Sequence, residues 1–407
     1  MSDAPAANLP PQEPGPPSEP ERKRATPSEP ERKRGAPSEP APHKADTPAG
    51  AHSPQRPTRP LIGVTMGDPY GIGPEVTVKA LCDPALRASG RFVVYGIDRV
   101  LQRAARRAGI TPFWFPVSTA ELERFDSGVV VVDFPEYGRF EDDQPRPTVE
   151  GGAASLRFVD EAIEGARRQV LDAIVTAPIH KVSWRLAGCR FPGHTEKLAD
   201  AFGVKRVTMM FAAGTLRLAL ASIHVALFDL RNLFTIGLVF QPIDLLAQAL
   251  RDWFGVPAPR IAVAGLNPHA SDGGRFGDEE QRIIEPAITM ARQAGIDARG
   301  PFAADTLFTP AQMGRYDGIV AMYHDQGLIP VKLLAFHSAV NLTLGLPIVR
   351  TSVDHGTAFD IVGRNQAHPG SMVEALRLAC LIASRAGASP PGPPRSVATP
   401  PSMRLPE

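Results

Sequence analysis

The chain has 407 residues, and its 44 lysines and arginines nearly cancel its 43 aspartates and glutamates, leaving a formal charge of +1. This balance predicts no nucleic-acid partner, because a polyanion-binding surface needs an excess of positive charge. No apolar run reaches the roughly 18 residues of a membrane span and there is no apolar signal core, so we expect a cytoplasmic chain without a membrane partner. Cys82, Cys189 and Cys380 stand far apart in the sequence, which is typical of reduced thiols.

Residues 1–57 differ in composition from the rest of the chain. They hold 15 of the 43 prolines, and the segment Pro17–Arg24 returns as Pro27–Arg34 and then, decayed, as Pro37–Pro40. With few large apolar side chains, such a segment cannot offset its ordering entropy, so we predict a disordered tail. Its 8 basic and 8 acidic residues favour a solvated polyampholyte over a nucleic-acid-binding arm. The proline-rich residues 388–407 form a second predicted tail.

Between the tails, short β-rich runs alternate with amphipathic stretches. This alternation predicts the α/β class, with a largely parallel sheet and helices on both of its faces. The predicted strands are Leu61–Thr65, Arg91–Tyr95, Val129–Asp133, Ala173–Thr176, Arg206–Phe211, Leu216–Ser222, Arg260–Gly265, Gly318–Met322 and Val340–Leu344. The predicted helices include Ala153–Gln169, Lys197–Phe202, Ile243–Phe254, Asp278–Ala294 and Ser371–Ser384.

A glycine-rich segment, Gly67–Glu75, follows the first predicted strand. It contains Gly-x-Gly, but Val76 stands where a dinucleotide fingerprint needs a third small residue, so a Rossmann loop is weakly supported. We favour a structural strand-to-helix turn, with Pro74 in the first helical turn.

The segment Gly193–Glu196 places an imidazole and a hydroxyl just before a predicted helix. Amides of the helix amino terminus together with His194 and Thr195 suit an anionic or polar substrate group. A helix cap made by Thr195 is the equal alternative.

Three histidines, His224, His269 and His324, each follow a predicted strand and lie in a loop. In open α/β sheets, ligands bind where strands end. If the three imidazoles converge, they form an open divalent-metal site with positions free for substrate. Hydrogen-bonded loop histidines are the alternative, at about even odds, because the sequence does not show whether the three converge.

Lys332, Asn341 and Arg350 follow His324 within a short stretch. Lysine and arginine suit a phosphate or a carboxylate, and apolar flanking segments favour cations with partners over scattered surface charges.

Seven motifs occur in order: Gly67–Glu75, Thr176–Lys181, Gly193–Glu196, Gly265–Ala270, Ala304–Phe308, Tyr323–Gly327 and Arg350–Ala358. Together they resemble the 4-hydroxythreonine-4-phosphate dehydrogenase family of vitamin B6 (pyridoxal phosphate) synthesis. The resemblance runs from about Pro60 to Ala386 and includes neither tail.

The resemblance implies two α/β/α domains of the isocitrate and isopropylmalate dehydrogenase type, with the active site in the cleft between them. The catalytic unit would be 58–387, with 58–150 plus 335–387 as the first domain and 151–334 as the second. It also implies a homodimer with the active site at the subunit interface. The implied reaction is the NAD- or NADP-dependent oxidation of 4-phosphooxy-L-threonine to 2-amino-3-oxo-4-phosphooxybutanoate, which loses CO₂ to give 3-amino-2-oxopropyl phosphate.

Residue by residue, the resemblance implies that His224, His269 and His324 bind a zinc, magnesium or cobalt ion, one of them from the partner subunit. These histidines and Lys332 would be the catalytic residues. The implied substrate contacts are His194, Thr195, Lys332, Asn341 and Arg350. The implied nicotinamide contacts, in a loop similar to the adenine-side loop of isocitrate dehydrogenases, are His355, Gly356, Thr357, Ala358 and Asp360.

Two residues depart from the family pattern: Tyr70 stands in place of alanine, and Phe228 in place of arginine. They keep open a paralogous dehydrogenase acting on another phosphorylated hydroxy acid, such as D-threonate or D-erythronate 4-phosphate. A metal-dependent phosphate-ester hydrolase or a non-catalytic phosphosugar-binding protein is a further rival, which nicotinamide binding would exclude.

Overall fold

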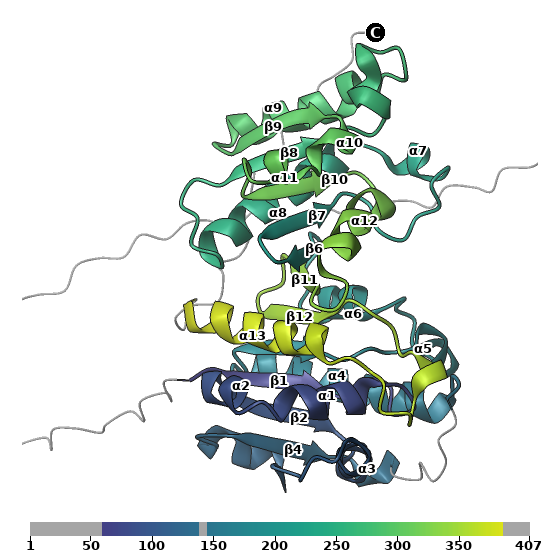
Figure 1. Cartoon of the computed structure of the whole chain (residues 1–407), viewed down its shortest axis with the longest axis vertical. Coiled ribbons are helices and arrows are strands. Elements are labelled where there is room, and N and C mark those ends of the chain that lie inside the picture. Colours follow the sequence, from purple (N-terminus) through teal and green to yellow (C-terminus); the bar gives the residue numbers. More distant parts are fainter. Residues whose placement is uncertain (1–58, 138–144, 386–407) are drawn as a thin grey trace, which may run out of the picture. The chain divides into compact units, whose positions relative to one another are not determined.

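The computed structural model describes residues 59–137 and 145–385, so both predicted tails lie outside the described residues. In the described part, twelve strands form one sheet in the order β3-β4-β2-β1-β5-β12-β11-β6-β7-β10-β8-β9 (Figure 1). The strands are β1 (Leu61–Thr65), β2 (Arg91–Gly96), β3 (Phe115–Val117), β4 (Val129–Asp133), β5 (Ala173–Thr176), β6 (Thr208–Ala213), β7 (Leu216–Leu220), β8 (Arg260–Ala264), β9 (Asp297–Phe302), β10 (Gly318–Ala321), β11 (Val340–Leu344) and β12 (Val349–Val353).

The sheet is largely parallel, as predicted, with an antiparallel section in its middle. Strand β11 runs antiparallel to both β12 and β6, and β6 is antiparallel to β7. On either side of this section, β5 pairs in parallel with β12, and β10 pairs in parallel with β7 and β8. Central strands such as β1, β2 and β12 are buried along their whole length, so both faces of the sheet are covered.

Helices pack on the sheet on both sides of the antiparallel section. Helix α4 packs on β1, β2 and β5, helix α13 packs on β5, β11 and β12, and helix α8 packs on β6, β7 and β10. The helices are α1 (Gly73–Leu81), α2 (Pro84–Ser89), α3 (Asp98–Ala108), η1 (Thr119–Arg124), η2 (Pro135–Tyr137), α4 (Val149–Arg167), α5 (Lys181–Leu186), α6 (His194–Ala201), α7 (Leu230–Leu233), α8 (Ile236–Asp252), η3 (Pro268–Asp272), η4 (Glu280–Ile284), α9 (Glu285–Gln293), α10 (Ala304–Leu307), α11 (Pro310–Met313), α12 (His324–Ala335), η5 (Phe359–Ile361) and α13 (Gly370–Arg385).

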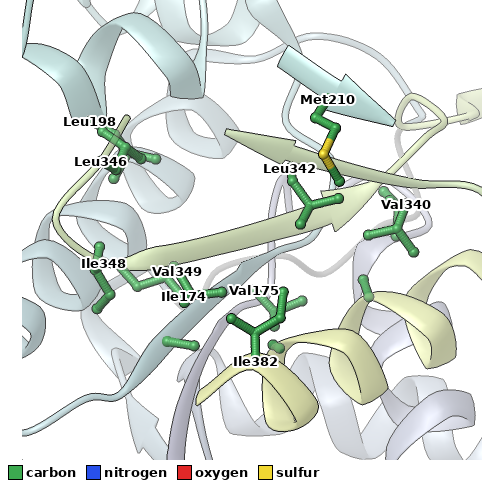
Figure 2. Packing of buried hydrophobic residues seen from close by; sticks show 14 of the residues in the cluster. Ile174, Val175, Leu198, Met210, Val340, Leu342, Leu346, Ile348, Val349 and Ile382 are labelled. Carbon is green, nitrogen blue, oxygen red and sulfur yellow. The ribbon is translucent and has the colours of Figure 1, made fainter. Parts of the chain in front are cut away.

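The core at the middle of the sheet joins residues that are distant in sequence. Leu342 of β11 and Met210 of β6 are register partners with no exposed surface, and they lie side by side in Figure 2. Ile382 of α13 lies beside Ile174 and Val175 of β5. This apolar packing holds β5, β11 and β12 rigidly together, and these strands carry most of the site described below.

Several sequence-based boundaries are wrong. Strands β3, β9 and β12 were not predicted as strands: β3 is short, β9 contains glycine and proline, and β12 carries a buried arginine in its apolar run. Helix α8 begins at Ile236 and continues through Pro242, although proline normally disfavours a helix interior. The predicted helix Asp278–Ala294 is a π-helix, η4, followed by α9.

Helix α6 begins one turn earlier than predicted, with Gly193 as its N-cap, so Thr195 lies within the first turn and is not the cap. Among the helices of residues 59–137 and 145–385, none is both long and apolar enough to cross a membrane.

Candidate active site

A cavity of about 350 Å³ opens where β5, β11 and β12 meet the first turn of α6. Its wall includes Thr176 at the end of β5, Asn341 of β11 and Arg350 of β12. His194, Thr195 and Glu196 enter from α6, and His224 and the segment after β12 complete the lining. The structure therefore brings together four of the five predicted substrate contacts: His194, Thr195, Asn341 and Arg350.

Arg350 is the main buried charge of this cavity. Its side chain is only 3% exposed, and its guanidinium donates hydrogen bonds to two neutral hydroxyls, Thr343 Oγ1 at 3.0 Å and Thr176 Oγ1 at 2.7 Å. Its Nε is buried and has no hydrogen-bond partner among the described residues. Burial lowers the pKa of Arg350 to about 10, with the charge of Glu196 acting in the opposite direction. A desolvated cation with only neutral partners is a binding point for a phosphate or a carboxylate.

Other polar atoms of the cavity are also without partners. Asn341 Oδ1, His194 Nε2 and His355 Nε2 are buried and make no hydrogen bond within the described part of the chain. Burial lowers the pKa of His194 well below its ordinary value, and the charges of Arg350 and Lys197 add to this effect, so its imidazole is neutral. Buried polar atoms are normally satisfied, so this group of unpaired atoms indicates a cavity shaped for a polar ligand.

Lys332, the fifth predicted substrate contact, lies in helix α12 and lines a neighbouring cavity of about 180 Å³. Its Nζ lies 2.7 Å from Asp354 Oδ2 and donates a hydrogen bond to the Asp354 carbonyl at 2.6 Å. Asp354 and His355 line both cavities, so the two cavities are adjacent.

The predicted nicotinamide loop lies beside this second cavity. His355 and Ala358 line it, and His355 Nδ1 lies 3.0 Å from the Gly356 carbonyl. Thr357 is buried and its carbonyl accepts a hydrogen bond from the amide of Ile72. Asp360 is exposed and is not among the residues that line the cavity.

The glycine-rich segment supports this loop. A Cβ added at Gly71 would stand 2.9 Å from Thr357 Cβ, and one added at Gly73 would stand 2.2 Å from the Met66 carbonyl oxygen. The glycines therefore allow close packing of the turn against the loop after β12, which supports the structural interpretation of Gly-x-Gly.

The three histidines follow neighbouring parallel strands, β7, β8 and β10, and so leave the sheet at the same edge. The rings of His224 and His324 are 5.8 Å apart between centroids, and His324 Nδ1 lies 2.7 Å from Asp325 Oδ1. Burial lowers the pKa of His224, with Lys181 and His324 contributing, which keeps the imidazole available as a ligand.

His269 does not join the other two histidines. It is exposed, its nearest ring is Phe276 at 6.2 Å, and it does not line the cavity of Arg350. Within the described residues, no group of three histidine, cysteine, aspartate or glutamate side chains is placed to hold one ion.

The loop that carries His269 is held in a strained conformation. All four residues from His269 to Asp272 have positive φ angles. Glu280, which is 1% exposed, accepts hydrogen bonds from the backbone amides of Leu266 at 2.8 Å and Asn267 at 2.7 Å. A strained loop persists where its surroundings over-determine it, so Glu280 is the anchor that presents His269 to solvent.

Sequence reasoning gave no role to three polar residues of the site. Lys181 and Glu196 line the cavity, and Ser183 donates a 2.9 Å hydrogen bond to Asp68, which is fully buried behind the glycine-rich turn. Lys181 and Glu196 do lie in motifs noted above, and their place directly after β5 and at the start of α6 was the available signal.

The two departures from the family pattern lie outside the cavity. Tyr70 packs against the start of α4, where a Cβ on Gly151 would stand 2.9 Å from its ring, and Phe228 is 94% exposed. Neither residue lines the cavity around Arg350.

Comparison with known proteins agrees with this fold and site. The model of the family described as pyridoxal phosphate biosynthetic protein PdxA matches residues 88–379. The chain is 46% identical to 4-hydroxythreonine-4-phosphate dehydrogenase of Geobacter metallireducens, covering 80% of this chain and 96% of the relative. It is 43% identical to D-threonate 4-phosphate dehydrogenase of Cupriavidus necator, covering 80% and 98%.

Among solved structures, 4-hydroxythreonine-4-phosphate dehydrogenase from Klebsiella pneumoniae is similar with a TM-score of 0.71 and 37% identity, covering 80% of this chain and 99% of that one. The α/β sheet with an anion-binding cavity is thus the architecture of a family of dehydrogenases. The chain belongs to the PdxA family.

Proposed function

We propose that this chain is an NAD(P)-dependent 4-hydroxythreonine-4-phosphate dehydrogenase of pyridoxal phosphate synthesis, the activity named for its relative from Geobacter metallireducens. The observation that carries the proposal is the buried guanidinium of Arg350, which has only hydroxyl partners and lies in a cavity with further unpaired polar atoms. A substrate with a phosphate and a carboxylate supplies the anions that this cavity lacks.

In this proposal the substrate is 4-phosphooxy-L-threonine, and the chain orients it for reaction at its C3 hydroxyl. Arg350 and Asn341 hold an anionic end, His194 and Thr195 contact the substrate from α6, and Lys332 reaches it from the adjacent cavity. Binding energy at the anionic groups fixes the position of C3, so groups remote from the reacting carbon accelerate the reaction.

The donor set fits a divalent metal ion only in part within one chain. His224 and His324 lie close together, and Asp325 holds His324 Nδ1, which leaves Nε2 for a ligand. We propose that these two residues bind the ion together with His269 of the partner subunit. When bound, a zinc, magnesium or cobalt ion supplies positive charge that favours loss of the hydroxyl proton and polarises the ketone for decarboxylation.

The cofactor is proposed to lie in the adjacent cavity, with contacts from His355, Gly356, Thr357, Ala358 and Asp360. When bound, NAD or NADP accepts the hydride that leaves C3, and the hydroxyl proton is lost at the same stage. The product, 2-amino-3-oxo-4-phosphooxybutanoate, then releases CO₂ and takes up a proton to give 3-amino-2-oxopropyl phosphate. The shared lining of the two cavities supports this arrangement, because it places cofactor and substrate side by side.

A homodimer is proposed because an apolar surface is exposed near the histidines. On helix α12, Ile329, Leu333 and Phe336 are 60%, 82% and 68% exposed, and their spacing puts them on one face. Leu227 and Phe228, after His224, are 62% and 94% exposed. Large exposed apolar patches are typical of interaction surfaces, and a second copy covering this one would also supply the third histidine.

The test is reduction of NAD or NADP in the presence of 4-phosphooxy-L-threonine, followed by absorbance before and after a chelator and then with zinc, magnesium or cobalt restored. Metal-dependent reduction supports the proposal. Metal-independent reduction would refute the role of His224, His269 and His324, and absence of any nicotinamide reduction would refute the dehydrogenase.

A second candidate is supported by the relative from Cupriavidus necator, which is named D-threonate 4-phosphate dehydrogenase and is nearly as similar as the first. In this alternative the substrate is D-threonate or D-erythronate 4-phosphate. Because neither Tyr70 nor Phe228 lines the cavity, the two departures do not themselves favour it. Comparison of kcat/KM for the three substrates decides between the candidates.

A cytoplasmic location and the division into domains 58–150 plus 335–387 and 151–334 stay predictions. The free state of Cys82, Cys189 and Cys380 is consistent with a reducing compartment.

A further inference from the structure

The cavity contains one carboxylate that has no cationic partner, that of Glu196. This residue is the third of helix α6, is half-buried and lines the cavity together with Lys181 and Arg350. Among the described residues, no lysine, arginine or histidine lies within ion-pair distance of it. The neighbouring Lys197 is paired with Asp160 at 2.6 Å, on a different partner.

Glu196 also lacks the usual structural task of a glutamate at this position. A glutamate three residues after the N-cap often accepts a hydrogen bond from the N-cap amide. Helix α6 has Gly193 as its N-cap, and the described structure contains no side-chain capping bond there. The positive end of the helix dipole still favours the ionised form of a carboxylate in this turn. Glu196 is therefore a negative charge left available to the cavity.

The surroundings place this charge within the binding space. A Cβ built on Gly193 would stand 3.4 Å from Glu196 Oε2 and 3.9 Å from Lys181 Cε, so both side chains border the same point. Glu196 also acts electrostatically on His224 and Arg350: burial is the main effect on both and lowers their pKa values, while the Glu196 charge acts to raise them. The carboxylate thus lies near the cations of the cavity without being neutralised by them.

The charges of the cavity match those of an amino acid phosphate. Arg350 and Lys181 are cations, and Glu196 is an anion, whereas Asp354 is neutralised by Lys332. The substrate proposed above carries a phosphate, a carboxylate and a C2 ammonium group. A phosphorylated hydroxy acid keeps the two anions but has a neutral hydroxyl at C2, and would leave Glu196 unpaired in a partly desolvated site.

We infer that Glu196 binds the C2 ammonium group and is the residue that selects a 2-amino substrate over its 2-hydroxy analogue. The inference rests on the proposed function, since it concerns the substrate of the same site. Selectivity of this kind is strong because a polar group placed for one substrate is left without a partner by the other.

The test compares wild-type protein, Glu196→Gln and a control variant with two substrates. These are 4-phosphooxy-L-threonine and the analogue of the same configuration with a hydroxyl at C2. The control is Asp200→Asn, which removes another carboxylate of α6 that lies outside the cavity and pairs with Arg190 at 3.2 Å. We expect Glu196→Gln to lower kcat/KM about 20-fold for the amino substrate, mostly through KM, and less than about threefold for the analogue.

Retention of the carboxylate gives an independent check. Glu196→Asp keeps the charge on a shorter side chain, so it should retain more of the preference for the amino substrate than Glu196→Gln does. Thermal unfolding of each variant shows whether the fold is intact, because a merely structural role of Glu196 would lower both the melting temperature and the activity on both substrates.

Equal losses on both substrates, or no loss on either, would overturn the assignment of Glu196 while leaving the proposed function in place. Wild-type turnover of the hydroxy analogue alone would overturn the proposed function itself, and the assignment with it. A selective loss on the amino substrate supports both.

Discussion

Replacement of Arg350 by methionine should abolish substrate binding while leaving the fold almost as stable as before. Arg350 is buried in β12 and donates hydrogen bonds only to Thr343 and Thr176. Methionine has a similar length and no charge, so it fills the space without offering a donor. The anion that we place against the guanidinium then loses its main partner.

The magnitudes follow from the structure. The pKa of Arg350 falls from 12.5 to about 10, so its charged form is disfavoured by about 3 kcal/mol in the folded state. Loss of two hydrogen bonds from a charged group costs about 3 to 6 kcal/mol before relaxation, so the net change in the free energy of unfolding is small, about 2 kcal/mol or less. Loss of a buried charged contact to substrate costs about 3 kcal/mol, or at least a hundredfold in kcat/KM.

The assay is steady-state nicotinamide reduction with 4-phosphooxy-L-threonine, alongside thermal unfolding. The matched control is Arg217→Met, because Arg217 is a largely buried arginine whose pKa is also lowered by burial but which does not line the cavity. We expect a raised KM only for Arg350→Met. An unchanged KM, or a melting temperature that collapses together with activity, would show that Arg350 serves the fold instead of the substrate.

Three further predictions concern the supports of the site. Ser183→Ala removes the 2.9 Å hydrogen bond to the buried Asp68, and chemical denaturation should show a loss of about 1 to 2 kcal/mol. Glu280→Ala leaves two amides unpaired behind the His269 loop, so metal affinity measured by chelator competition should fall about tenfold or more; unchanged affinity would contradict the anchoring role. Burial lowers the pKa of His194, so below about pH 6.5 the unfolded state binds a proton that the folded state does not, and stability falls as the pH decreases. Melting curves at about pH 7 and pH 5 should show a smaller loss for His194→Gln than for wild type, and equal losses would refute this account.

Local pattern was enough to place most strands of the sheet. β1, β4, β5 and β11 begin and end where their apolar runs do, because a strand buried on both faces needs continuous hydrophobic residues. Strand β12 escaped prediction because Arg350 interrupts its run, and the position of that charge is meaningful only once Thr176 and Thr343 are beside it. The interruption that hid the strand is thus the functional feature.

The sequence by itself determined the α/β class, the family and the residue types available for anion and metal binding, because these depend on hydrophobic period and on motifs in chain order. The tertiary structure alone decided which of these residues meet. It pairs Lys332 with Asp354, separates His269 from His224 and His324, and leaves Glu196 without a cation. The physical reason is that such contacts depend on strand order: Arg350 reaches Thr176 across 174 positions of the chain only because β5 and β12 are neighbours in the sheet.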